Sequence, residues 1–170
     1  MNKRKALLLI NLGTPNTPSY WSVYKFLNQF LMDKRVLDYP FIFRFLLVNF
    51  IICPLRSFSS SKIYKKLWHP ETGSPLLHNT KELTKKISML LPDYEVAYAM
   101  RYQNPSIEEV INKLLVNNPD ELIIMPLFPH YAASTTGSVF AEVSRVLNKR
   151  WSIPEIKFIN QFYDNADFID

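Results

Sequence analysis

The chain has 170 residues, 48% of them hydrophobic and 21% charged, which suffices for one well-buried globular domain and argues against a disordered chain. A single cysteine, Cys53, excludes an internal disulfide and an iron–sulfur cluster held by the cysteines of this chain alone. The net charge of +5 suits an anionic small molecule or an anionic membrane surface as well as nucleic acid, and no basic-aromatic motif favours nucleic acid.

The amino-terminal segment predicts a strand, a turn and a helix. Ala6 to Leu12 is a short apolar run without a small-residue cleavage site, so it reads as a buried strand and not as a signal peptide. The residues NLGTP then form a turn. Ser19 is the expected N-cap of a helix that ends near Met32, because apolar residues follow it at helical spacing.

The segment Val36 to Leu55 allows two interpretations. Its residues 41–52 are apolar on nearly all sides, but the run is shorter than the roughly 20 residues of a transmembrane helix. Arg44 and Asn49 interrupt it, and prolines bracket it. It is either a buried helix of the domain or an exposed apolar lip that touches a membrane or an apolar ligand. The residues alone favour the buried helix.

Two helices and a strand are predicted next. Residues 59–68 have helical spacing, and residues 69–75 form a loop. Asn79 to Glu82 has the spacing of a capping box, which predicts a helix that begins there and stops at Pro92. Tyr94 to Met100 reads as a second strand, and residues 101–105 as a loop.

The last third alternates in the same way. Ser106 and Glu109 form a second capping box before a helix, and Leu122 to Met125 is an apolar strand. A polar loop over residues 134–138 leads to a helix that ends near Lys149, and a strand follows at residues 156–160. This alternation predicts an α/β fold with a doubly wound, mostly parallel sheet. Residues 164–170 look like the start of an unfinished helix, so we expect the chain to be a fragment.

Three loops, after Leu12, Met100 and Pro129, should lie at the carboxyl ends of strands, where open α/β sheets bind ligands. The predicted rim consists of Asn11, Thr14, Arg101, Tyr102, His130, Tyr131 and Ser134, which Arg56 and Ser74 could join. No catalytic triad order, metal-binding histidine spacing or P-loop is present. These side chains predict a site for a flat, partly apolar, anionic ligand without acid–base chemistry. Alternatively, Ser134 or Thr135 only caps the following helix.

Seven motifs in order resemble the ferrochelatases of the bacterial protoheme type, from about Leu7 to Asp170. They are INLGTP, FLNQFLMDKRV, PLRS, IYKKLW, GSPL, MRYQNPS and PLFPHYAASTTGS. The resemblance implies a chelatase fold of two similar domains. Residues 1–170 would be the amino-terminal domain, with an apolar lip at about 36–55, and the carboxyl-terminal domain would be absent. The implied activity, of the lyase class, inserts ferrous iron into protoporphyrin IX in the last step of heme biosynthesis.

The resemblance also implies a set of site residues. The porphyrin would contact Leu12, Arg56, Tyr64, Ser74, Arg101 and Tyr102, and the pocket loop would contribute His130, Tyr131, Ser134 and Thr135. Relatives that use coproporphyrin have a tyrosine at the position of Leu12, so this residue favours protoporphyrin. The run from Phe41 to Ile52 matches the lip at the pocket mouth, which meets the membrane in some members, and this match favours the lip over the buried helix.

The family's iron-handling histidine lies in a Ser-His-Gly or Ser-His-Ser motif of the second domain, with an acidic partner further on, and these residues contain neither. We therefore expect no catalytic residue and no metal ligand in this chain, and no iron insertion by it alone. Ferrous iron and protoporphyrin IX would be substrates, with no iron–sulfur cluster. The protein would be cytoplasmic and peripheral on the inner face of the cytoplasmic membrane. Two alternatives remain, namely a non-catalytic porphyrin- or heme-binding module, and an anion- or nucleotide-binding domain that uses residues 134–138.

Overall fold

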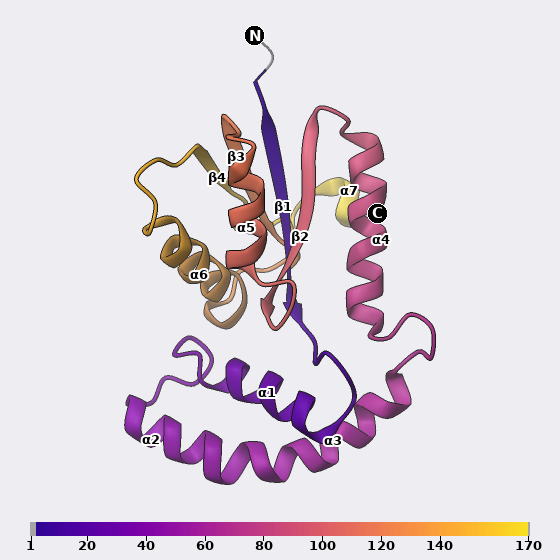
Figure 1. Cartoon of the computed structure of the whole chain (residues 1–170), viewed down its shortest axis with the longest axis vertical. Coiled ribbons are helices and arrows are strands. Elements are labelled where there is room, and N and C mark those ends of the chain that lie inside the picture. Colours follow the sequence, from indigo (N-terminus) through magenta and orange to yellow (C-terminus); the bar gives the residue numbers. More distant parts are fainter. Residues whose placement is uncertain (1–2, 170) are drawn as a thin grey trace. The chain divides into compact units, whose positions relative to one another are not determined.

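The structure, a computed structural model, describes residues 3–169, which form two compact units (Figure 1). The first unit comprises the described residues of Met1–Leu12, Thr80–Arg101 and Pro105–Asp170. The second comprises Gly13–Asn79 and Tyr102–Asn104.

The first unit is built on a four-stranded parallel sheet with the order β2-β1-β3-β4. Its strands are β1 (Lys5–Gly13), β2 (Tyr94–Tyr102), β3 (Glu121–Pro126) and β4 (Glu155–Phe158). Leu8 pairs with Ile124 between β1 and β3, and Leu122 pairs with Ile156 between β3 and β4. Strand β2 lies on one side of β1 within the sheet. The chain then crosses to β3 and β4, which lie on the other side of β1. The predicted α/β, doubly wound architecture is confirmed.

The core of the first unit lies between one face of the sheet and the helices α5 (Ile107–Val116) and α6 (Ser138–Leu147). Leu8 and Ile124 point to this core, together with Ile111 of α5 and Val143 of α6. Leu7 and Leu9 of β1 are buried as well, on the opposite face. Because both faces of β1 are covered, the strand is apolar at consecutive positions instead of alternating.

The caps explain where several helices begin. Ser106 accepts a hydrogen bond from the backbone N–H of Glu109 at the start of α5, as its sequence predicts. Helix α4 (Pro75–Leu90) begins five residues earlier than the capping box at Asn79–Glu82 predicts, so that prediction is wrong. The reason is Pro75, whose fixed φ suits a first helical residue. A short helix, α7 (Ala166–Ile169), ends the described chain as expected, and Asp170 lies outside the described residues.

The second unit is helical. Helix α1 (Tyr20–Leu31) has Ser19 as its N-cap, which accepts a hydrogen bond from the backbone N–H of Ser22. It packs against α3 (Cys53–Leu67), which continues without a break from α2 (Phe41–Leu46) and the π-helical turn η1 (Leu47–Ile52). Together these three elements form one helix, Phe41–Leu67, of 27 residues (Figure 1).

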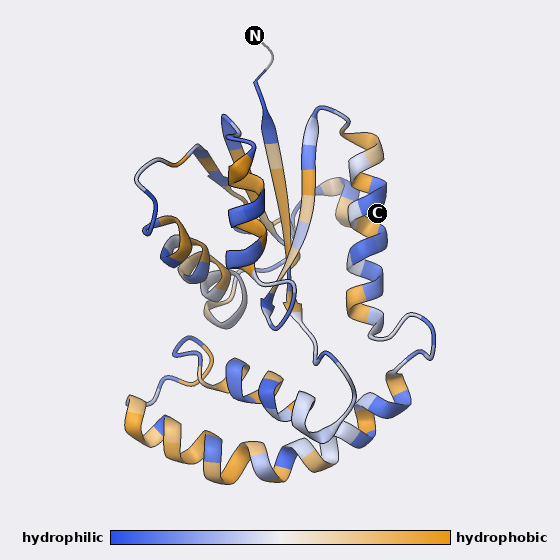
Figure 2. Cartoon of the chain, viewed as in Figure 1, coloured by the Kyte–Doolittle hydropathy of each residue, from blue (hydrophilic) through white to orange (hydrophobic). Residues whose placement is uncertain are grey.

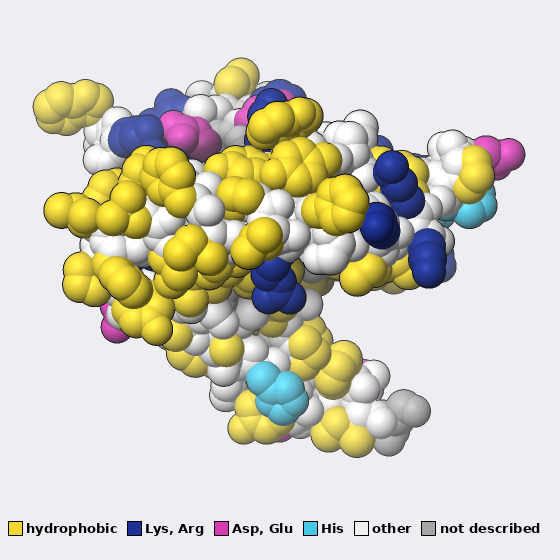
Figure 3. Space-filling model, turned by 90° about the horizontal axis from the view of Figure 1, so that it is seen from below, with side chains coloured by type: hydrophobic (Ala, Val, Ile, Leu, Met, Phe, Trp, Pro, Cys, Tyr) yellow, Lys and Arg dark blue, Asp and Glu magenta, His cyan; other side chains and the backbone are white. Residues whose placement is uncertain are grey.

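This long helix contradicts the expectation of a buried helix over Val36 to Leu55. It exposes apolar side chains along its outer side, at Phe41, Ile42, Phe43, Phe45, Leu46, Phe50, Ile51, Leu55, Phe58, Ile63 and Leu67. Figure 2 shows the apolar colouring along it, and Figure 3 shows apolar side chains gathered over its outer face. The apolar side chains are therefore exposed, as the lip interpretation expects, and contact with a membrane or an apolar ligand stays a prediction. By length and composition alone the helix is also apolar enough to cross a membrane.

The two polar residues that interrupt the apolar run attach the helix to its own unit. Arg44 is buried, and its guanidinium donates to the carbonyl oxygens of Leu37 and Tyr39 at 3.0 and 3.1 Å. Asn49 Oδ1 accepts hydrogen bonds from Asn28 Nδ2 at 2.7 Å and from the Tyr24 hydroxyl at 3.4 Å. Both residues thus face inward and leave the outer side of residues 41–52 apolar.

Candidate functional site

The carboxyl edge of the sheet in the first unit contains the topological switch point. Strands β1 and β3 are neighbours, and their outgoing connections lead to opposite sides of the sheet. Loops diverge at such a point and leave a crevice that ligands occupy. Asn11 and Leu12 lie just before the end of β1 here, and the loop after Pro126 leaves β3. Asn11 Nδ2 donates to Thr80 Oγ1 at 3.1 Å, which holds the end of β1 against α4.

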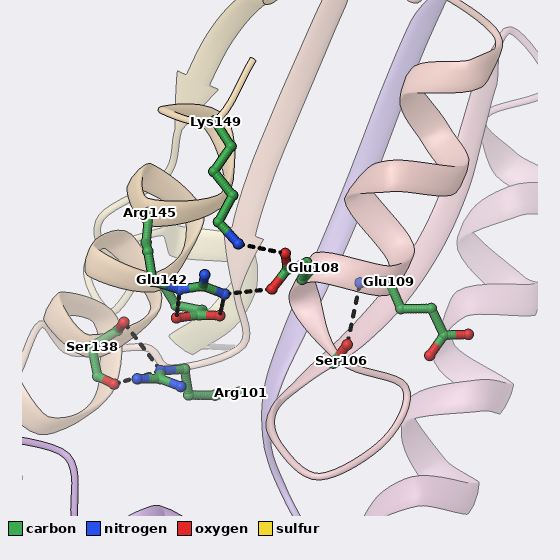
Figure 4. Close-up of polar contacts among 8 residues, drawn as sticks. All are labelled: Arg101, Ser106, Glu108, Glu109, Ser138, Glu142, Arg145 and Lys149. Atoms are coloured by element: carbon green, nitrogen blue, oxygen red, sulfur yellow. Dashed lines mark hydrogen bonds and ion pairs between the residues drawn. The ribbon is translucent and has the colours of Figure 1, made fainter.

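Arg101, at the end of β2, is joined to the start of α6. Its Nε donates to Ser138 Oγ at 2.7 Å and to the Ser138 carbonyl oxygen at 3.2 Å (Figure 4). Ser138 is buried, and the sequence suggested it only as part of residues 134–138 of the anion-binding alternative. The contact shows that Arg101 secures the first turn of α6 to the sheet, in addition to any contact with a ligand. Arg101 belongs to strand β2 (Tyr94–Tyr102), so the prediction of a loop over residues 101–105 is wrong at this residue.

The polar loop before α6 is a single π-helical turn, η2 (Ala133–Gly137). The backbone N–H groups of Thr135 and Gly137 donate to the Ala132 carbonyl oxygen at 3.2 and 3.0 Å. Neither Ser134 nor Thr135 caps α6, because the residue before it is Gly137 in a helical conformation. Two of the N–H groups that an anion would use are thus already bonded within the loop, which weakens the anion-site alternative.

His130 and Tyr131 lie at the surface of the first unit. The ring of His130 stacks on that of Tyr163, with centroids 4.7 Å apart and planes 20° apart. Tyr131 is exposed. His130 has an aromatic partner and no carboxylate bonded to either ring nitrogen among the described residues. This arrangement presents flat, partly apolar surface and no acid–base pair.

Two more candidates are buried in the second unit. Ser74 Oγ donates to Thr14 Oγ1 at 2.9 Å, which connects the turn after β1 to the start of α4. The Tyr102 hydroxyl donates to Asp33 Oδ2 at 2.9 Å, and its ring packs edge-on against Phe30. Tyr102 has no exposed surface, so a ligand would reach it only if these contacts opened. Asp33 was not recognised from the sequence, because an acidic residue after a helix gives no distinctive signal.

Arg56 and Tyr64 both belong to α3 in the second unit. The guanidinium of Arg56 is exposed and has no side-chain partner within residues 3–169. Tyr64 is half-buried, with its ring edge-on to Phe26 at 6.4 Å, and this burial raises the pKa of its hydroxyl. Arg56 is thus a cation open to an anionic group, while Tyr64 is a neutral hydroxyl beside an apolar surface.

No group of three or more histidine, cysteine or acidic side chains is gathered for a metal ion within the described residues. Burial raises the pKa of the Cys53 thiol to about 11, so it stays protonated near neutral pH and is a poor metal ligand. A polar cleft of about 490 Å³ lies at the amino ends of the strands, with Arg4, Asp120 and Glu155 in its lining. It lies at the opposite edge of the sheet from the predicted site residues of the first unit.

Comparison with known proteins identifies the family. The ferrochelatase family model matches residues 4–170. The ferrochelatases of Escherichia coli O139:H28 (strain E24377A / ETEC) and of Escherichia coli strain SE11 are each 38% identical to the chain over 167 residues. The chain belongs to the ferrochelatase family. The matched region covers 98% of the chain and 52% of each relative, so the chain spans about half the length of these ferrochelatases.

The candidates carried over from the ferrochelatase resemblance are divided between the units. Leu12, Arg101, His130, Tyr131, Ser134 and Thr135 belong to the first unit, and Arg56, Tyr64, Ser74 and Tyr102 belong to the second. Within the first unit Leu12 and Arg101 lie one residue before the ends of the neighbouring strands β1 and β2. Whether these ten residues bind a porphyrin stays a prediction.

Proposed function

We propose that the chain is the porphyrin-gripping part of a ferrochelatase that inserts ferrous iron into protoporphyrin IX. Family membership over residues 4–170 supports this proposal most strongly. The residues present suit a porphyrin chemically, because a porphyrin is a large flat apolar ring with carboxylate side groups. Leu12 and Tyr131 offer apolar and aromatic surface, and the open guanidinium of Arg56 suits a propionate group.

Iron insertion requires a porphyrin to lose two pyrrole protons, and a histidine is a suitable acceptor near neutral pH. His130 is a weak candidate for this role, because it is exposed and stacked on Tyr163. We therefore place the proton acceptor and the iron-handling residues in a second domain. The role of this chain is to hold the ring, and binding energy from its side groups can favour a bent macrocycle that exposes a nitrogen lone pair.

We also propose a cytoplasmic protein that makes peripheral contact with a membrane. The exposed apolar side of the helix Phe41–Leu67 is the feature that supports this placement. An apolar porphyrin would then pass between the bilayer and the site without crossing much water. The exposed lip and the porphyrin ring thus both favour an apolar phase.

The experiment is a steady-state assay of iron insertion into protoporphyrin IX by the full-length protein and its Arg56→Ala variant. Loss of a charge-assisted hydrogen bond to a propionate should raise the KM for porphyrin by roughly 10- to 100-fold, with a smaller effect on kcat. Lys25→Ala, which removes a cation from the exposed side of α1, is the control and should leave KM unchanged. An unchanged KM in Arg56→Ala would remove Arg56 from the site, and porphyrin binding without any iron insertion would favour a non-catalytic porphyrin-binding protein.

A further inference from the structure

The polar cleft at the amino edge of the sheet is built by three segments of the first unit. Strands β1, β3 and β4 are parallel neighbours, so the residues that enter them lie side by side. The backbone N–H of Asp120 donates to the Arg4 carbonyl oxygen at 2.8 Å, and that of Glu155 donates to the Asp120 carbonyl oxygen at 3.0 Å. The cleft of about 490 Å³ is within the size of small-molecule sites, roughly 300–1,000 Å³. Its volume therefore allows a small ligand.

Two arginines line this cleft, and neither forms an ion pair within residues 3–169. Arg4 Nη1 donates to the Asn117 carbonyl oxygen at 2.9 Å, and Arg150 Nη2 donates to Asn112 Oδ1. A guanidinium has five N–H donors, so each arginine retains donors beyond these bonds. The planar fork of these donors matches the oxygen atoms of a phosphate group. The two side chains therefore suit a phosphate on the ligand.

Two carboxylates line the same cleft, so inorganic phosphate alone does not match its charge. Asp120 Oδ2 accepts a hydrogen bond from the backbone N–H of Arg4 at 2.8 Å, and Glu155 Oε1 lies 3.9 Å from Lys157 Nζ. A carboxylate has about four lone-pair sites and only accepts hydrogen bonds, so both retain capacity for hydroxyl or amino donors. Acidic side chains use this capacity to bind ribose hydroxyls in nucleotide sites. The cleft therefore matches a ligand that carries an anionic group together with hydroxyl groups.

Trp151 adds an aromatic surface beside the cleft. It lies between Arg150 and Ser152, which both line the cleft, and its side chain is 106% exposed. An indole with this exposure packs on no other side chain, so both of its faces are open. Nucleobases stack on open aromatic side chains of this kind. A single exposed apolar residue is ordinary on a protein surface, and the arginines and carboxylates beside Trp151 are what indicate a base-bearing ligand.

We propose that this cleft binds a mononucleotide. Its phosphate accepts hydrogen bonds from Arg4 and Arg150, its ribose hydroxyls donate to Asp120 or Glu155, and its base stacks on Trp151. The site lies at the opposite edge of the sheet from the predicted porphyrin residues of the first unit, and beyond the carboxyl end of α6 instead of at residues 134–138. The inference therefore does not depend on the proposed function.

The test titrates the full-length protein with adenosine monophosphate and follows tryptophan fluorescence, excited at a wavelength that adenine does not absorb. We expect saturable quenching, because the base covers the indole of Trp151. Adenosine and inorganic phosphate, which each lack one part of the ligand, should bind at least about tenfold more weakly. Trp151→Phe should lose most of the quenching. Trp21→Phe, which removes a tryptophan that is 69% exposed on α1, is the control and should keep it.

Calorimetric titration of two further variants separates the base from the phosphate. Trp151→Ala should weaken the binding of adenosine monophosphate by roughly tenfold or more through lost stacking. Arg150→Gln should weaken it by roughly 10- to 100-fold through a lost charge-assisted contact, while the weaker binding of adenosine stays unchanged. Lys86→Gln, which removes an exposed cation from α4 of the same unit, is the control and should bind as the unaltered protein does. Circular dichroism on heating confirms that each variant remains folded.

Several outcomes would overturn the nucleotide site. The absence of saturable quenching would do so, and so would equal affinity for adenosine and adenosine monophosphate, because the arginines would then contact no phosphate. Shielding of Trp151 from acrylamide in the unliganded full-length protein would also overturn it, because another part of that protein would then cover the indole. Nucleotide binding by a protein that inserts no iron would contradict the proposed enzyme and leave this inference standing.

Discussion

At the scale of single residues, Gly13 adopts a positive φ that residues with a side chain rarely adopt. Gly13 ends β1 with φ of +109°, and a Cβ atom there would lie 2.0 Å from the carbonyl oxygen of Tyr102. Gly73 also has a positive φ, of +74°, but its nearest neighbour would be the Trp68 ring at 3.7 Å. Both glycines thus meet a conformational requirement, and only Gly13 also meets a steric one.

Replacing Gly13 by alanine should therefore destabilise the protein more than replacing Gly73. For Gly73→Ala we expect a loss of about 1–2 kcal/mol, the cost of a left-handed conformation in an L-residue. For Gly13→Ala we expect at least about 3 kcal/mol, because the new methyl group also displaces backbone. Urea denaturation of both variants measures the difference. Equal losses would mean that the end of β1 relaxes freely away from Tyr102.

At the scale of elements, α5 and α6 are joined by a group of charges. Glu108 of α5 accepts hydrogen bonds from Lys149 at 2.8 Å and Arg145 at 2.6 Å, and Arg145 also pairs with Glu142 (Figure 4). These bonds lower the pKa of Glu108 from 4.5 to about 2, with the Lys149 contact first and the Arg145 contact second. The side chains remain partly exposed, so solvent screens the interaction.

Because the folded state lowers this pKa, Glu108 contributes stability above its unfolded pKa and loses it as the pH falls from about 4.5 toward 2. We expect Glu108→Gln to be less stable than the unaltered protein at neutral pH, with the gap narrowing through that acidic range. Denaturation midpoints across the range test this. Glu71→Gln, which removes a carboxylate in the loop before α4 and outside this group of charges, is the control. A constant gap for Glu108→Gln would contradict the pairing.

At the scale of the whole molecule, the chain corresponds to half of its relatives. It aligns over 98% of its own length and 52% of theirs. We propose that the native polypeptide carries a second domain with the iron-handling residues, which would complete the site that this chain begins.

The intact mass of the native polypeptide tests this proposal. We expect about twice the 20.0 kDa of this chain, since the chain covers 52% of its relatives. We also expect the 170-residue chain alone to insert no iron. A native mass of 20.0 kDa would contradict the second domain and favour a porphyrin-binding protein or one half of a split chelatase.

The sequence determined the elements whose signals are local. The apolar run of β1, the caps at Ser19 and Ser106 and the alternation of strands and helices were all readable, because each depends on a few neighbouring residues. The family was readable from ordered motifs, and comparison confirmed it.

Only the tertiary structure decided which surfaces are buried and which side chains meet. The helix Phe41–Leu67 is apolar nearly all round over its first half, so its pattern could not show that one side packs on α1 and the other faces solvent. The contact of Arg101 with Ser138 and that of Tyr102 with Asp33 join residues 37 and 69 positions apart. Spacing along the chain carries no record of such pairs, because they form only when the fold brings distant segments together.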